Sequence, residues 1–426
     1  MTEDQSTHAR YILGYALVAA MLCGGGTVRG LWIDAFLQIG LICASTYVII
    51  RFPNQSASSA GISMFCLVLF VGLVQLIPLP VAIFGEIRQH IFLPQINDTV
   101  VSSTTISLAS SRTISSLMTA LCPIYFFVAL SKLQQSDLMC LVRFFLLAVA
   151  LNLVVLLLSY SSDQAVDFSS FLGFDVGVGL FANDNHLSSL LCASIPLFIY
   201  AGMFMGWGYV SNFAVLAILV LLLAIGSRAG ILIGIATLSS SLVLLFWKAC
   251  IGRFAGLALL AIVTVYGYGA FVRIGAEVEE TTLSRRDFTL TTVRAIEENW
   301  LTGTGFGSFD MVYPHYQRPQ DVYSVFVNHA HNDFLEVFLE GGLAVAAIII
   351  CYLWLLFARL FALELSPLQR LSFLSVCVVL IHSTVDYPLR TTAISIAFAF
   401  FNALLFSPRN RPLMSPSNGR SVAFGL

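Results

Sequence analysis

The sequence predicts an all-α polytopic integral membrane protein with about 12 transmembrane helices. Of its 426 residues, 58% are hydrophobic and only 10% are charged, whereas soluble domains carry about 25% charged residues. The mean hydropathy is +0.88, and apolar runs of about 20 residues, long enough to cross a bilayer, recur along the chain. The net charge of −2 offers no basic surface for nucleic acid.

The apolar runs and the polar segments between them define the predicted organisation. The candidate spans are 11–24, 31–50, 60–84, 114–131, 138–160, 185–205, 209–226, 229–247, 254–272, 333–358, 369–388 and 391–407. The chain is therefore divided into N-terminal membrane helices (1–272), one large polar loop (273–332), C-terminal membrane helices (333–407) and a tail (408–426) expected to be disordered.

The distribution of basic residues in short loops predicts the orientation. With both termini in the cytoplasm, most short-loop positive charges, including both lysines, fall on the inner side. The long loop 273–332 then lies outside, which in a bacterium is the periplasm. The expected location is thus the inner membrane, with many passes.

Arginines on the predicted outer side are exceptions to that rule. They are Arg228, Arg285, Arg286, Arg294 and Arg390. The guanidinium group is a planar fork of donors that suits phosphate and carboxylate. A single arginine could equally pair with an acidic residue of the loop, but the set favours an anionic ligand at the outer face. Arg228 lies at the start of a predicted helix, where the helix dipole adds to its charge.

His331 and the helix after it form the second candidate feature. We expect His331 to stand in the first turn of an inward-running helix, where the helix dipole favours a neutral ring that can accept a proton. Asn332, Glu336 and Glu340 recur at helical spacing along one stripe of this helix. Carboxylates in a membrane helix are costly and usually functional. The alternative is an interfacial histidine that orders the loop.

Two weaker polar clusters lie at other predicted span ends. Asn185 and His186 precede one span, and Asp386 and Arg390 join the last two. Asp386 could simply neutralise Arg390, so a structural role is at least as probable for both clusters. Within the loop, 289–298 has helical character, with Leu290, Val293, Ile296 and Glu297 expected to face the bundle.

These features restrict the chemistry. No ATP or nucleotide sugar is available outside the cytoplasm, so a donor must arrive already activated. A lipid-linked diphosphate sugar meets this need, because its diphosphate suits the arginines and its tail suits a groove between helices. No Asp-x-Asp metal pattern occurs in the outer loops, so no metal or other cofactor is expected, and arginines would stabilise the departing diphosphate.

At these residues the chain resembles the bacterial superfamily of O-antigen ligases and of O-antigen and exopolysaccharide polymerases. His331-Asn332, nine residues and Gly342 are similar to its His-Asn-x9-Gly signature. Arg286-x3-Leu290 is similar to the ligases' Arg-x3-Leu, although spacing from the glycine turn at 303–307 selects Arg285 instead. Ser227-Arg228-Ala229-Gly230 resembles the superfamily's Ser-Arg-Gly/Ala segment.

The resemblance implies a GT-C-like glycosyltransferase that is metal-independent and inverting. Its donor would be an undecaprenyl-diphosphate-linked oligosaccharide, with Arg228 and Arg285 or Arg286 binding the diphosphate and His331 activating the acceptor hydroxyl. The acceptor would be a growing glycan for a polymerase, or lipid A-core or another acceptor for a ligase. Membrane lipid would surround the protein. A flippase and a chain-length regulator are the protein partners it implies.

The clusters at 181–186 and 382–390 are more similar to exopolysaccharide polymerases, and Leu343, Ala344 and Val345 depart from the ligase pattern after Gly342. We therefore favour a polymerase over a ligase. A transporter or lipid-linked glycan flippase is the rival from another class. Transporters usually place ionisable residues near the bilayer midplane and show repeated halves, and neither feature is evident here.

Overall fold

The protein is a helical membrane protein. A computed structural model describes residues 3–27, 30–52, 55–80, 103–161, 172–173, 177–246, 280–319, 326–361 and 365–408. Among these residues, 7 helices are long and apolar enough to span a membrane. They are α2 (Trp32–Arg51), α5 (Ser110–Leu130), α6 (Gln135–Ser161), α8 (Asp184–Phe204), α9 (Gly208–Ile225), α10 (Arg228–Phe246) and α14 (Asp333–Leu360).

Further helices complete the described part of the bundle. They are α1 (Glu3–Cys23), α3 (Ser59–Gln75), α12 (Glu280–Asn299), α13 (Phe309–Tyr316), α15 (Pro367–His382) and α16 (Thr392–Phe406). The predicted spans that fall on described residues coincide with helices, except that 60–84 ends at Gln75 and 369–388 ends at His382. The predicted span 254–272, the loop residues 273–279 and 320–325, and the tail after 408 lie outside the described residues. The number of twelve therefore stays a prediction.

Local sequence explains where two of these helices end or begin. After α3, Pro78 and Pro80 lie in a short strand, β1 (Pro78–Pro80), which pairs antiparallel with β2 (Ser103–Thr105). Proline lacks the N–H that a helix interior needs, so the helix does not continue. At α15, the Ser366 hydroxyl accepts from Gln369 N, Gln369 caps Ser366 N in return, and Pro367 occupies the first helical position.

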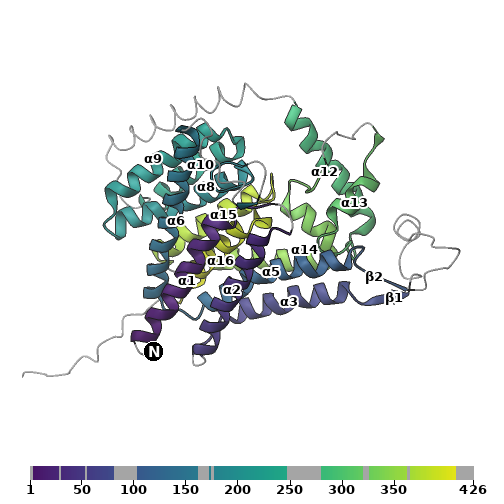
Figure 1. Cartoon of the computed structure of the whole chain (residues 1–426), viewed down its shortest axis with the longest axis horizontal. Coiled ribbons are helices and arrows are strands. Elements are labelled where there is room, and N and C mark those ends of the chain that lie inside the picture. Colours follow the sequence, from purple (N-terminus) through teal and green to yellow (C-terminus); the bar gives the residue numbers. More distant parts are fainter. Residues whose placement is uncertain are drawn as a thin grey trace, which may run out of the picture.

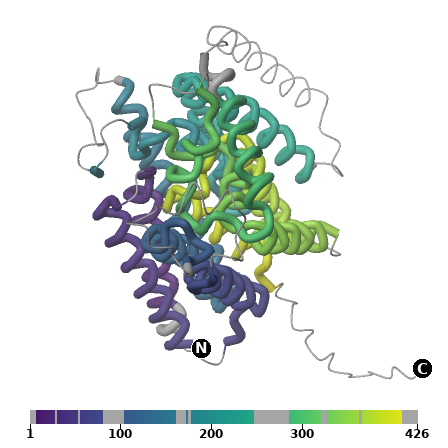
Figure 2. The backbone as a smooth tube through the Cα atoms, turned by 90° about the vertical axis from the view of Figure 1, so that its right-hand side faces the viewer, coloured from purple at the N-terminus to yellow at the C-terminus, as the bar shows by residue number. Residues whose placement is uncertain are grey.

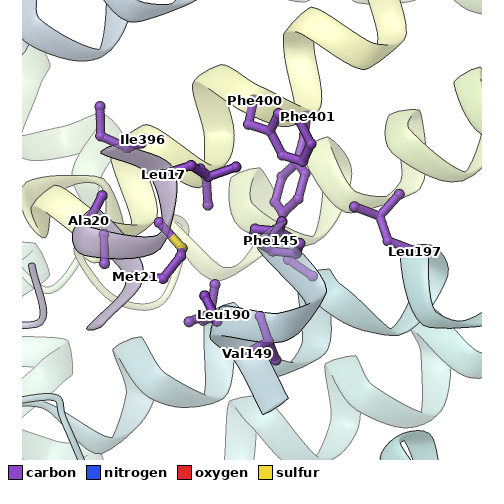
Figure 3. Close-up of a cluster of buried hydrophobic side chains, with 14 of the residues drawn as sticks. Leu17, Ala20, Met21, Phe145, Val149, Leu190, Leu197, Ile396, Phe400 and Phe401 are labelled. Atoms are coloured by element: carbon purple, nitrogen blue, oxygen red, sulfur yellow. The ribbon is translucent and has the colours of Figure 1, made fainter. Parts of the chain in front are cut away.

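The C-terminal hairpin of α15 and α16 runs through the middle of the bundle. The pair contacts α1, α5, α8 and α10, and the yellow C-terminal segments lie between the purple and teal helices in Figure 1 and Figure 2. Phe145 of α6 packs on Phe400 and Phe401 of α16 with ring centroids 5.6 and 5.3 Å apart. Figure 3 shows these rings together with Leu17 and Met21 of α1. The last helix is therefore a central element of the core.

Outside this core, α12 and α13 pack on the N-terminal half of α14 (Figure 1). The predicted helix at 289–298 is confirmed, but its predicted buried face is wrong at Leu290, which is 47% exposed, and at Glu297, which is also exposed. The prediction is confirmed at Ile296, which is buried together with Thr291, Thr292, Ala295 and Asn299. Because these side chains are mostly small, α12 can pack closely on α13 and α14. The spacing of the apolar residues predicted a face centred about a third of a turn away around the helix axis.

A break in α14 at Gly342 fixes the turn that follows α12. Gly342 has φ 58° and ψ −153°, a region that only glycine occupies readily. An added Cβ there would lie 2.7 Å from Leu301 O. Leu343 N donates to Leu301 O at 3.2 Å, and Gly305 N donates to Glu340 O at 2.9 Å. The glycine-rich turn at 303–307 is therefore bound to the kinked helix.

Candidate active site

The ends of four helices meet at one polar cluster. It forms where α8, α10 and α14 begin and where α15 ends, and α12 contributes to it from the side. In Figure 1, α8, α10 and α15 lie next to one another. Three helix N-termini at one place create a positive local field. These helix ends, together with α12, contain most of the candidate residues that were predicted from the sequence.

Asp386 is the centre of the cluster. Its carboxylate is almost fully buried and accepts hydrogen bonds from Asn185 Nδ2 at 2.6 Å and from Tyr387 N at 2.9 Å. His331 Nδ1 lies 3.2 Å from Asp386 Oδ1. An ionised carboxylate can only accept, so Nδ1 of His331 is the donor, and in the neutral ring Nε2 is left unprotonated. The side chain of His331 is 24% exposed.

His331 itself lies before the helix, not in its first turn as expected. The N-cap of α14 is Asn332, whose side chain accepts from Leu335 N at 3.1 Å and donates to Thr384 O at 2.8 Å. The asparagine takes the capping position because its short amide satisfies a free helix N–H. The Asp386 carboxylate therefore makes the polar contact with the His331 ring. Asn332 anchors the start of α14.

Ser227 and Asn185 connect the start of α10 to this carboxylate. Ser227 Oγ donates to Asn185 Oδ1 at 2.7 Å and accepts from Gly230 N at 3.1 Å. A Cβ on Gly230 would lie 2.6 Å from Cβ of Ser188, so the glycine allows α10 to pack closely on α8. Arg228, the first residue of α10, is half-buried beside Ser227. The small residues around Arg228 thus bring it to the edge of the cluster.

The two neighbouring arginines of α12 differ in their surroundings. Arg285 Nη2 lies 3.8 Å from Asp386 Oδ2, and its side chain is 42% exposed. Arg286 is exposed, and successive residues of a helix point about 100° apart. Phe288, one turn further along α12, stacks on the His331 ring with centroids 5.6 Å apart. Of the pair, Arg285 is therefore the arginine at the cluster.

Arg390 does not neutralise Asp386, as the sequence suggested it could. Its guanidinium instead lies 3.0 Å from Glu340 Oε2, 3.4 Å from Glu336 Oε1 and 3.8 Å from Asp333 Oδ1. Glu336 and Glu340, which lie on one stripe of α14, are fully buried. The chain after α15 turns through a 3-10 helix (Pro388–Arg390), which directs Arg390 back towards α14. Arg390 is therefore a structural partner of α14.

His186 is also structural rather than exposed to a substrate. It is fully buried, its Nδ1 lies 2.5 Å from Thr391 Oγ1, and its Nε2 lies 3.9 Å from Asp386 Oδ1. It therefore packs against Asp386 from the interior of the protein. Gly342 makes the close packing with 301–303 described above. Its place in the motif, with nine residues between it and Asn332, therefore reflects the fold of the turn, not contact with the cluster.

Two residues near His331 were not singled out by the sequence. His329 Nδ1 lies 2.8 Å from Glu336 Oε1, which makes a second, buried histidine–carboxylate pair. The Tyr387 ring stacks on His329 with centroids 4.1 Å apart and meets the His331 ring edge-on at 5.1 Å. The sequence carries a signal for His329 in its position two residues before His331, but none for Tyr387, which depends on the fold of the last hairpin.

Burial and neighbouring charges set the protonation states of Asp386 and Tyr387. Burial raises the pKa of Asp386, but the hydrogen bond from His331 and the charges of His186, His331 and Arg285 outweigh this and hold that pKa well below its usual range. Burial and the carboxylates of Asp386 and Glu336 raise the pKa of Tyr387 to about 12. Asp386 is thus a carboxylate, and Tyr387 a neutral phenol, over the physiological range.

Comparison with known families identifies the central stretch of the chain. The family model described as O-antigen ligase matches residues 213–350. These residues are therefore similar to the O-antigen ligase family. The match confirms the resemblance to the O-antigen ligase and polymerase superfamily and indicates a glycosyltransferase-like membrane enzyme. No curated protein matches the chain at a significant level.

The residues that match the O-antigen ligase family contain only part of the cluster. Arg228, Arg285 and His331 lie within the matched residues, whereas Asn185 and Asp386 lie outside them on either side. The hydrogen bonds of Asp386 join the two groups. The candidate site therefore combines the matched stretch, 213–350, with segments that precede and follow it.

Proposed function

We propose that the protein transfers a glycan from a polyprenyl diphosphate, expected to be undecaprenyl diphosphate, to an acceptor hydroxyl at the periplasmic face of the inner membrane. The observation that carries the proposal is the pairing of His331 with Asp386, 3.2 Å apart, beside Arg285. A base oriented by a carboxylate and a cation next to it are what such a transfer requires. His331 and Arg285 both lie within the residues that match the O-antigen ligase family.

In the proposed step, His331 Nε2 accepts the proton of the acceptor hydroxyl as its oxygen attacks the anomeric carbon of the donor sugar. The new C–O bond forms while the bond from that carbon to the diphosphate oxygen breaks, and the diphosphate leaves with the electron pair. A single displacement inverts the anomeric configuration. Asp386 keeps the His331 ring in the productive tautomer and stabilises the imidazolium that forms, as the carboxylate does in a histidine-containing triad.

Arg228 and Arg285 are the proposed diphosphate ligands. Arg228 is the first residue of α10, and Arg285 lies against the cluster. The side chain of Arg285 is exposed enough for a ligand to reach it. The starts of α8, α10 and α14 add backbone N–H groups and helix dipoles that favour an anion. In this proposal the arginines supply the positive charge that a divalent cation supplies in other transfer reactions, so transfer should continue in excess EDTA.

Two kinds of acceptor are compatible with the proposed transfer. We propose that the acceptor is a growing polysaccharide, because the segments containing Asn185 and Asp386 join the site and are similar to those of polymerases. The ligase alternative, with lipid A-core as the acceptor, is favoured by the description of the matching family as O-antigen ligase. Deletion of a polymerase should leave single repeat units, whereas deletion of a ligase should leave long, unattached chains, and gel profiles of the glycans separate these results.

His331→Ala tests the proposed transfer against lipid flipping. Loss of transfer should leave lipid-linked repeat units accumulating on the periplasmic side of cells that carry this variant. Cytoplasmic accumulation would support a flippase instead. His315→Ala is the matched control, because His315 is exposed on α13, outside the cluster. It should give the wild-type glycan profile.

A further inference from the structure

The backbone of His331 has a conformation that its own chemistry does not favour. Among the described residues, it is the one non-glycine with a positive φ, 49°. Such left-handed positions are uncommon for residues other than glycine, although histidine, like asparagine and aspartate, adopts them more often than most. They persist where the surrounding structure determines them, often at functional sites. The contacts on either side of His331 therefore decide whether its ring meets Asp386.

On its C-terminal side, His331 is anchored to the connection after α15. Asn332 Nδ2 donates to Thr384 O at 2.8 Å, and Asp333 N donates to Ser383 O at 2.9 Å. These bonds attach the start of α14 to the segment that carries Asp386. They fix one end of the His331 backbone relative to its partner.

On its N-terminal side, one buried carboxylate holds both preceding residues. Glu336 Oε2 accepts from Ala330 N at 2.8 Å, and Glu336 Oε1 lies 2.8 Å from His329 Nδ1. Glu336 and Ala330 are fully buried, so these bonds are shielded from competing water. The Tyr387 ring, stacked on His329 and in contact with His331, closes the arrangement.

From these contacts we infer that Glu336 is a positioning residue that holds His331 in its strained conformation against Asp386. The inference rests on the proposed function of His331 as the base. Charge balance with Arg390 does not by itself account for Glu336, because Asp333 and Glu340 also pair with that arginine. Glu336 differs from them in bonding the two residues directly before His331. A buried carboxylate in a membrane helix is expensive, which fits a role beyond neutralisation.

Glu336→Gln and Glu340→Gln form a matched pair for the test. Both remove one negative charge beside Arg390 from the same stripe of α14, but only Glu336 bonds the 329–330 segment. With purified full-length protein in liposomes and a lipid-linked oligosaccharide donor, Glu336→Gln should lower kcat on the order of 10- to 100-fold with KM changed less than about twofold. This is the size of effect expected from a small misplacement of a catalytic group. Glu340→Gln should stay within about threefold of wild type.

A double variant separates positioning from a general structural role. In the His331→Ala background, Glu336→Gln should leave the residual rate unchanged, because the group that it positions is gone. If Glu336→Gln is no slower than Glu340→Gln, or if it slows the His331→Ala enzyme by the same factor as the wild type, the inference is wrong.

A reading that does not depend on activity distinguishes this failure from failure of the proposed function. The rate at which diethyl pyrocarbonate modifies His331, mapped by mass spectrometry, should rise severalfold in Glu336→Gln and stay unchanged in Glu340→Gln. Equal rates in the two variants overturn the inference. If His331→Ala instead keeps the wild-type transfer rate, the proposed function of His331 fails, while the labelling comparison still decides whether Glu336 positions it.

Discussion

Nδ1 of His331 lies 3.2 Å from Oδ1 of Asp386, although the two residues are separated by 55 positions in the chain. The contact joins the segment before α14 to the connection between α15 and α16. It places a carboxylate acceptor on the side of the imidazole that faces the core and leaves the other ring nitrogen for a proton from outside. The following predictions test this relationship and the fold that creates it.

Replacing Asp386 by asparagine should impair transfer while preserving shape. The amide cannot stabilise an imidazolium, and its NH2 group favours the wrong tautomer of His331. We expect kcat to fall on the order of 10²- to 10⁴-fold in a purified transfer assay. Asp137→Asn is the control, since Asp137 is equally buried but lies beside Arg10 at the start of α6. Wild-type kcat in Asp386→Asn would contradict the paired arrangement.

The neighbouring arginines of α12 should respond differently to the same change. Arg285→Lys replaces a planar fork by a point charge at the cluster, so the kcat/KM for the lipid-linked donor should fall about 10- to 100-fold. Arg286→Lys should stay within about threefold, because Arg286 is exposed away from Asp386. Initial rates over a range of donor concentrations measure both variants. The reverse order would assign the diphosphate to Arg286.

The low pKa of Asp386 predicts a pH-dependent contribution to stability. Because the folded state lowers this pKa, the contribution is fully present above the unfolded value of about 3.9 and is lost as the pH falls below it towards the folded value. The Tm difference between wild type and Asp386→Asn in detergent should therefore be constant from about pH 5 to 8 and shrink below about pH 4. A difference that grows on acidification would mean that the folded state raises this pKa.

Gly342→Ala should destabilise the turn at 301–305. The backbone at Gly342 has φ 58° and ψ −153°, and an added Cβ would meet Leu301 O at 2.7 Å. Strain of this kind costs about 1–3 kcal/mol before the clash is counted. Gly40→Ala is the matched control, because a Cβ at Gly40 in α2 meets nothing within 4 Å. Thermal unfolding followed by size-exclusion chromatography should show a lower Tm for Gly342→Ala alone.

The segments of the chain carried different amounts of information about the site. The spacing of His331, Asn332 and Gly342 indicated the family, and the stripe of Glu336 and Glu340 indicated functional carboxylates on one side of the helix. The predicted face of α12 was wrong at Leu290 and Glu297. Leucine usually marks a buried position, but Leu290 is 47% exposed, whereas Thr291 and Ala295 are buried although their residue types are poor markers of burial. Neither the ionic partners of Arg390 nor the stacking of Tyr387 has a local signature.

By itself, the sequence determined that this is a helical membrane protein, where most of its described helices lie and which arginines and histidine are candidates for chemistry. These properties depend on hydropathy and on motifs, both of which are local along the chain. Only the tertiary structure decided that Asp386 pairs with His331, that Arg390 pairs with α14 and that Glu336 bonds the two residues before His331. Such pairings depend on how helix ends distant in sequence are brought together by packing, and no local pattern encodes them.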